Sequence, residues 1–210
     1  VFVPCDLTDK SDLNLFYEKT LKTFNGLDVL INNVGGICKL AGFHDLEDED
    51  WIQTFQQFIV ALHADKRKTV GICFGHQMIA QALGGEVRRC ERGWGIGVKE
   101  IAITAPEPWM QPPLTGVRML FTHQDQVEVL PPDARLIGGT DDCPHAMFAL
   151  GNHMLAMQPH PEYSRRYLRA IIESREAIIE PLTFQTGLAS LEQPPHREEP
   201  AAWLRHFLLG

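Results

Sequence analysis

The sequence has 210 residues, of which 44% are hydrophobic, and this is long enough for one α/β domain with a packed core. Its formal net charge of −8 and the lack of a long Lys/Arg run argue against a nucleic-acid-binding surface. No apolar run reaches the roughly 18 residues that a membrane-spanning helix needs, and the first residues lack the basic and apolar regions of a signal peptide.

The N-terminal segment predicts a β-α-β unit. A short β-branched run covers residues 1–4, and Ser11 is placed to cap a helix over residues 12–24 that ends at Gly26. The apolar run at 27–32 predicts a buried strand. Because a helix separates the two strands, they are expected to be parallel.

The rest of the chain continues with helices and strands. An acidic stretch at 45–50 precedes a predicted helix over 51–63, and a strand at 68–72 is followed by a helix over 74–83. The remaining predicted elements are short strands at 98–104, 118–121, 126–129 and 134–138, a hairpin of strands at 146–150 and 153–158, a helix over 162–180, a polar loop containing prolines, and a helix over 200–209. This order predicts a single α/β domain over residues 1–210, with a mostly parallel sheet flanked by helices and a β-meander insert.

A turn around Cys73 contains the most informative residues. The segment 69–77 has the pattern strand, G-x-C-x-G, helix, which is the thiol counterpart of the G-x-S-x-G nucleophile elbow. Gly71 and Gly75 lack Cβ atoms, so the backbones can pass closely. The helix N-terminus favours a thiolate, and the N–H of Phe74 is expected to point to a developing oxyanion. The alternative is a buried structural cysteine.

His160 and Glu162 are the candidate partners of this thiol. Pro161 biases the residue before it toward extended geometry, in which side chains two positions apart point to the same side. Glu162 can therefore orient the His160 ring, which completes a set of nucleophile, base and orienting carboxylate. The alternative is a surface turn with an incidental histidine and glutamate.

The run G-I-C-F-G-H-Q and the later run Q-P-H-P-E are similar to those of the class I (triad) glutamine amidotransferases, and the closest likeness is to the GMP-synthase-like group. The resemblance covers about residues 58–210 and implies a flavodoxin-like α/β fold. It implies hydrolysis of glutamine through a γ-glutamyl thioester on Cys73, with His160 as base and then acid and Glu162 as its orienting partner. No cofactor is implied. Ammonia would go to an unknown acceptor on a separate synthetase subunit, or the enzyme would act alone on a γ-glutamyl compound.

The same resemblance implies substrate-binding residues. Gln77 matches a family position that helps to hold glutamine. The run at 122–127 matches a family segment that faces the pocket, which makes His123 and Asp125 candidate pocket residues. The alternative for these two residues is a loop between strands.

Residues 1–55 resemble a fragment of a short-chain dehydrogenase/reductase, through Asp6 after a strand and the run N-N-V-G-G at 32–36. The phosphate-binding turn T-G-x-x-x-G-x-G and the pair Tyr-x-x-x-Lys are absent, so an NAD(P)-dependent reductase is the least favoured function. We interpret the chain as a chimera of segments 1–55 and 56–210. A catalytically weak or inert chimera is the alternative to an active hydrolase.

The loop at 33–36 is the expected source of a second oxyanion donor. Glutamine amidotransferases use a glycine-containing loop there, and Gly35 or Gly36 stands in the corresponding place. Loss of one such donor costs on the order of a hundredfold in rate.

The cysteines and histidines predict neither a disulfide framework nor a metal site. The five cysteines are widely spaced, without a C-x-x-C pair, and the nine histidines show no H-E-x-x-H pattern. Free thiols are typical of a reducing compartment, so a cytoplasmic protein is expected.

Overall fold

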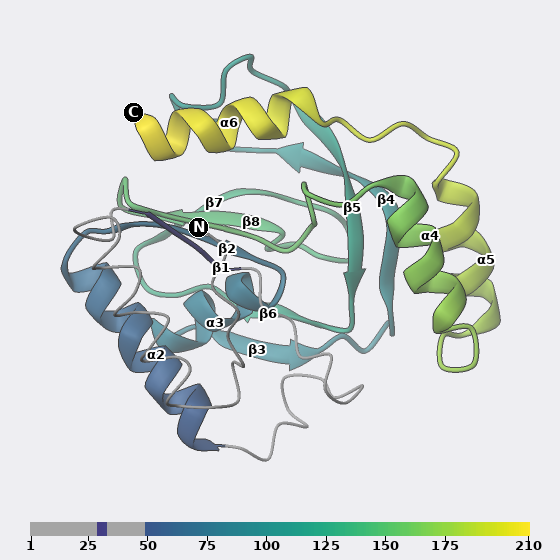
Figure 1. Cartoon of the computed structure of the whole chain (residues 1–210), viewed down its shortest axis with the longest axis horizontal. Coiled ribbons are helices and arrows are strands. Elements are labelled where there is room, and N and C mark those ends of the chain that lie inside the picture. The colour runs from purple at the N-terminus through teal and green to yellow at the C-terminus, as the bar shows by residue number, and fades with distance from the viewer. Residues whose placement is uncertain (1–28, 33–48) are drawn as a thin grey trace, which may run out of the picture.

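A computed structural model describes residues 29–32 and 49–210 of the chain (Figure 1). Its elements are β1 (Val29–Asn32), α2 (Glu49–Ala64), β2 (Lys68–Ile72), α3 (Phe74–Ala82), β3 (Glu86–Arg89), β4 (Gly95–Ile103), β5 (Gly116–His123), β6 (Asp125–Val129), β7 (Ala134–Gly139), β8 (Met147–Leu150), β9 (Met154–Met157), α4 (Arg165–Ser174), α5 (Pro181–Ser190) and α6 (Glu198–Leu209). The strand predicted at 1–4, the helix predicted at 12–24, and Gly35 and Gly36 lie outside the described residues.

The main sheet has seven strands in the order β1-β2-β9-β8-β7-β4-β5, and a second sheet pairs β3 with β6. The β1–β2 and β2–β9 pairs are parallel, while the β9–β8, β8–β7, β7–β4 and β4–β5 pairs are antiparallel. The prediction of a mostly parallel sheet is therefore wrong. The strands from β4 to β9 follow one another without an intervening helix, and such short connections favour antiparallel pairing.

Strands β2 and β9 lie in the interior, with a hydrophobic core on each face. One core contains Val70 and Leu155 together with Trp203 and Phe207 of α6. The other contains Met154 and Ala156 of β9 together with Met78 and Ile79 of α3. Figure 1 shows α6 on one side of the sheet and α2 and α3 on the other. Burial on both faces explains why these two strands read as nearly continuous apolar runs.

The C-terminal third differs from the prediction in two helices. Helix α4 begins later and ends earlier than the predicted 162–180, because the Ser164 side chain caps its N-terminus by accepting from the N–H of Tyr167. Helix α5 occupies part of the predicted loop, since Pro181 stands at its first turn, where proline needs no N–H partner. Strand β3 has no counterpart among the predicted elements.

Among the helices of the described residues, none combines the length and apolar character needed to cross a bilayer.

Candidate active site

Cys73 occupies the sharp turn between β2 and α3. Its backbone has φ 52° and ψ −103°, which is the left-handed region that non-glycine residues rarely adopt. Two hydrogen bonds hold this conformation: the Cys73 N–H donates to the carbonyl of Met157 over 2.9 Å, and the Cys73 carbonyl accepts from the N–H of Gln77 over 3.1 Å. The strain is thus stored where the chain presents its thiol at a helix N-terminus.

Gly71 allows the elbow to close. A Cβ atom at this position would lie 2.6 Å from the Gly75 carbonyl oxygen and 2.6 Å from Cδ1 of Ile79. No real side chain fits at such distances, so the expected close passage of the backbones at Gly71 is confirmed.

His160 and Glu162 form a buried ion pair. Nδ1 of His160 donates to Oε1 of Glu162 over 2.7 Å, and the His160 side chain is only 5% exposed. Burial alone would lower the pKa of His160, but its interactions with the Cys73 thiol and the Glu162 carboxylate outweigh burial and raise the pKa to about 9. The ring therefore carries a proton at neutral pH.

The second ring nitrogen of His160 is available for proton exchange. Nε2 is buried and makes no hydrogen bond of normal geometry within the described part of the chain. Cys73 nevertheless lies near enough to act on the pKa of the ring. Catalytic hydrogen bonds are often long without substrate and shorten when the substrate binds. This arrangement suits a thiol–imidazole pair that exchanges one proton.

Tyr163 fixes the plane of the His160 ring. The two rings stack with centroids 4.0 Å apart and an angle of 9° between their planes. Tyr167 supports Tyr163 edge-on, with centroids 4.7 Å apart. Tyr163 is not among the predicted site residues, although it directly follows the Q-P-H-P-E run.

Two buried glutamines lie beside the thiol. Gln158 Nε2 is 3.5 Å from the Sγ of Cys73, and Gln77 Nε2 donates to Gln158 Oε1 over 3.2 Å. Gln77 Nε2 also donates to the backbone carbonyl of Asp125 over 2.6 Å. Gln77 is a predicted substrate residue, whereas Gln158 is not among the predicted site residues.

His123 and Asp125 are buried residues that belong to strands and not to an open loop. His123 ends β5 and Asp125 begins β6. Burial, followed by the charge of Lys99, lowers the pKa of His123 to about 3, so its ring is neutral at pH 7. Asp125 connects to the site through its carbonyl bond to Gln77.

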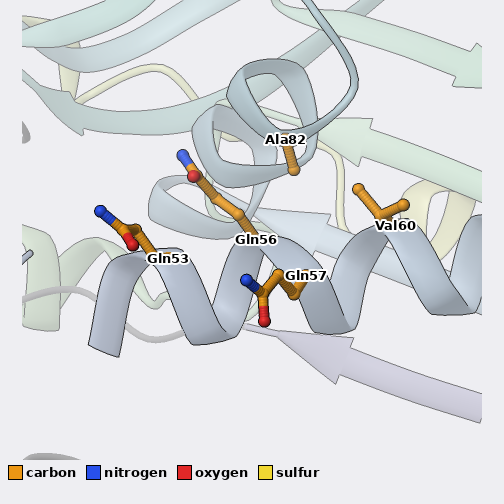
Figure 2. Close-up of a pocket in the computed structure, with 5 residues that line it drawn as sticks. All are labelled: Gln53, Gln56, Gln57, Val60 and Ala82. Carbon is orange, nitrogen blue, oxygen red and sulfur yellow. The ribbon is translucent and has the colours of Figure 1, made fainter. Parts of the chain in front are cut away.

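Two hollows lie on the surface of the described residues, and neither is lined by the Cys73, His160 and Glu162 side chains. The first, of about 360 Å³, is lined by Gln53, Gln56, Gln57 and Val60 of α2 and Ala82 of α3 (Figure 2). The second, of about 280 Å³, is lined by a charged set: Arg88, Arg89, Cys90, Glu91, Arg92, Gln126, Glu128, Asp141, Asp142 and Pro144. Within the described part of the chain, no group of three or more His, Cys, Asp or Glu side chains is placed to hold a metal ion.

Comparisons with known proteins agree with this site. The family model "Glutamine amidotransferase class-I" matches residues 16–176. "Gamma-glutamyl peptidase 2" of Arabidopsis thaliana is 36% identical over 143 residues, which cover 66% of this chain and 57% of the relative. The chain thus spans little more than half the length of this plant relative.

More distant relatives share the same family features. The glutamine-hydrolysing subunit of the GMP synthase of Pyrococcus furiosus is 37% identical over 94 residues, which cover 44% of this chain and 50% of that relative. The crystal structure of a glutamine amidotransferase from Thermotoga maritima superposes with a TM-score of 0.64 at 21% identity, covering 94% of this chain and 89% of that one. At this identity the superposition supports the fold alone.

The resemblance of residues 1–55 to a short-chain dehydrogenase is not supported. The family match begins at residue 16, inside that segment, and the relatives named above are peptidases or amidotransferases. Short motifs such as N-N-V-G-G occur in many loops after buried strands, which explains the misleading likeness. A chimera is therefore not needed to explain the sequence. With most of its length matched by one family model, the chain belongs to the class I glutamine amidotransferase family.

Proposed function

We propose that this protein hydrolyses γ-glutamyl amide bonds, with Cys73 as nucleophile, His160 as general base and acid, and Glu162 as the carboxylate that orients His160. The observation that carries the proposal is the strained backbone of Cys73 at a helix N-terminus, next to a histidine that is hydrogen-bonded to a carboxylate. A strained elbow costs free energy, and such strain is concentrated at functional sites. Nucleophile, base and orienting group form the arrangement expected for covalent catalysis.

In the acylation half, the Cys73 sulfur attacks the δ-carbon of the γ-glutamyl group after its proton passes to Nε2 of His160. The carbonyl π electrons move onto oxygen to form a tetrahedral intermediate. His160 then gives the proton to the leaving nitrogen, and the C–N bond breaks. The products of this half are an amine, or ammonia from glutamine, and a γ-glutamyl thioester on Cys73.

In the deacylation half, water attacks the thioester while Nε2 of His160 accepts one of its protons. The C–S bond breaks, glutamate leaves, and the proton returns to the sulfur. The sum is addition of one water across the amide bond. Glu162 keeps Nδ1 as the donor throughout, so Nε2 remains the nitrogen that moves the proton.

The oxyanion is assigned to the N–H of Phe74, the first residue of α3. This position follows the nucleophile directly, where backbone N–H groups of an elbow meet the developing charge. Gly35 and Gly36 remain the predicted second donors, and both lie outside the described residues.

The comparisons favour a γ-glutamyl peptide over glutamine as substrate. The plant γ-glutamyl peptidase matches 66% of this chain, whereas the GMP synthase relative matches 44%. The latter match supports the second candidate, a glutaminase that passes ammonia to a separate acceptor protein. In either case Gln77, His123 and Asp125 are the proposed substrate-binding residues.

One labelling experiment tests the nucleophile. Treatment with a γ-glutamyl chloroketone, followed by peptide mass spectrometry, is expected to modify Cys73 and to leave Cys90, which is also a free and half-buried thiol. The matched variant Cys90→Ala should retain the adduct, and Cys73→Ala should lose it. A folded protein that gives no Cys73 adduct would contradict the proposal.

A substrate comparison then separates the two candidates. Glutamate release is measured from glutamine and from a γ-glutamyl dipeptide at equal concentration. A peptidase is expected to show the higher kcat/KM with the dipeptide. A preference for glutamine would instead favour the glutaminase.

A further inference from the structure

Gln158 is fully buried beside the nucleophile, and it has no part in the proposed triad. Its exposed fraction is 0%, and its main-chain N–H donates to the carbonyl of Ala146 over 2.8 Å. The side-chain amide has the Sγ of Cys73 at 3.5 Å on one side and Nε2 of Gln77 at 3.2 Å on the other. A buried amide with both ends engaged has little freedom to turn.

The hydrogen-bond network fixes which end of the Gln158 amide faces the sulfur. The Asp125 carbonyl can only accept, so the NH₂ group of Gln77 must face it, at 2.6 Å. The same NH₂ group is 3.2 Å from Gln158, which must therefore present its oxygen there. The NH₂ group of Gln158 is consequently left for Cys73. Reversing the Gln158 amide would place two NH₂ groups against each other.

We propose that Gln158 is a positioning residue that donates an N–H to the Cys73 sulfur and stabilises its thiolate form, and that Gln77 fixes the direction of this donor. The inference rests on the proposed role of Cys73 as nucleophile. A donor aimed at a developing anion in a buried site stabilises that anion and needs no reorganisation. Because both N–H groups of Gln77 are engaged, Gln77 meets a substrate only through its Oε1, as an acceptor.

The direct test is Gln158→Glu, which keeps the size of the side chain and replaces the donor with a charged acceptor. The rate of Cys73 alkylation by iodoacetamide is followed between pH 5 and pH 10 by peptide mass spectrometry. The rate is expected to fall at least tenfold at pH 7 and to recover at high pH, which means that the whole curve moves upward by about one pH unit. A merely structural role would lower the rate without moving the curve.

Gln77→Glu is a second and independent test. A carboxylate at position 77 cannot donate to Gln158, so the Gln158 amide is expected to turn over and present its oxygen to the sulfur. The alkylation curve should again move to higher pH, although residue 158 is unchanged. This variant also keeps the proposal testable if Gln158→Glu does not fold.

Gln126→Glu is the matched control, because Gln126 is buried on β6 and the hydrogen bonds that link Gln77, Gln158 and Cys73 do not include it. Its curve should coincide with that of the wild type. Folded Gln158→Glu or Gln77→Glu protein with an unshifted curve would overturn the proposal. If the wild type instead takes up no chloroketone, the hydrolase proposal fails, while the iodoacetamide curves still report on the paired glutamines.

Discussion

At the scale of single residues, the charge of His160 depends on its neighbours. Burial favours the neutral ring, yet Cys73 and Glu162 raise the pKa of His160 to about 9. Replacing Glu162 with Gln removes one of these two partners and keeps its shape. The pKa of His160 should therefore fall, which can be followed by NMR titration of labelled histidine.

The same variant should lose activity. Without the carboxylate, Nδ1 loses the acceptor that fixes the tautomer of the ring, and kcat/KM for a γ-glutamyl dipeptide should drop on the order of a hundredfold. Glu192→Gln is the control, since Glu192 pairs with Arg169 at the exposed surface, away from the triad. Unchanged kinetics in Glu162→Gln would remove the carboxylate from the mechanism.

The stability given by the His160–Glu162 pair should depend on pH in a defined direction. The pKa of His160 is raised from 6.5 to about 9 on folding, so the native state binds the proton more tightly. The contribution is fully present below pH 6.5 and is lost as the pH rises toward 9. It amounts to at most about 3 kcal/mol. The difference in free energy of unfolding between wild type and Glu162→Gln, measured in urea, should shrink over this interval; a constant difference would contradict the assignment.

At the scale of elements, the β2–α3 elbow depends on one missing Cβ atom. Gly71→Ala would place a carbon 2.6 Å from the Gly75 carbonyl oxygen, which belongs to the backbone and cannot move aside. We expect a loss of about 2–3 kcal/mol in unfolding free energy, together with reduced Cys73 labelling. In the control variant Gly116→Ala, the new Cβ meets only the end of the flexible Glu100 side chain. Equal stability of the two variants would show that the elbow tolerates the extra carbon.

Elements with strong local signals can be predicted from the sequence, whereas their pairing cannot. The strand at 68–72 and the helix that follows it are predictable because a buried apolar run meets a glycine-flanked turn. Strand β3 has a weak pattern of its own and exists through its pairing with β6. The order β1-β2-β9 joins segments that are far apart in the sequence, and no local pattern encodes such a contact.

The site shows the same division. Cys73, His160 and Glu162 are identified from short runs in which neighbouring residues reveal the chemistry. Gln158 stands in one of those runs, but its role depends on a bond to Gln77 that only the folded chain creates. Sequence reasoning can therefore name the reacting groups and cannot name the groups that orient them.

At the scale of the whole molecule, two buried neutral histidines should make the fold sensitive to acid. Burial lowers the pKa of His76 to about 4 and that of His123 to about 3. The unfolded chain binds protons at these sites below pH 6.5, whereas the native state does not. Stability is thus fully present above pH 6.5 and falls as the pH drops toward 4.

The expected slope is up to about 1.4 kcal/mol per pH unit for each of these histidines. Urea unfolding at a series of pH values between 7 and 4 measures it. His123→Gln should flatten the slope, whereas His206→Gln, on the C-terminal helix, should leave it unchanged. An equal slope in wild type and His123→Gln would exclude this source of acid lability.

The parallel register of β2 with β9 has a consequence for how such proteins diversify. Ile72 lies opposite Met157, so Cys73 and His160 emerge from adjacent positions at one edge of the sheet. Their separation is governed by the spacing of two neighbouring strands, and the long excursion of chain between them does not enter into it. Segments such as the proline-rich turn at 106–113 can therefore lengthen, shorten or change in composition during evolution while the reacting pair stays in place.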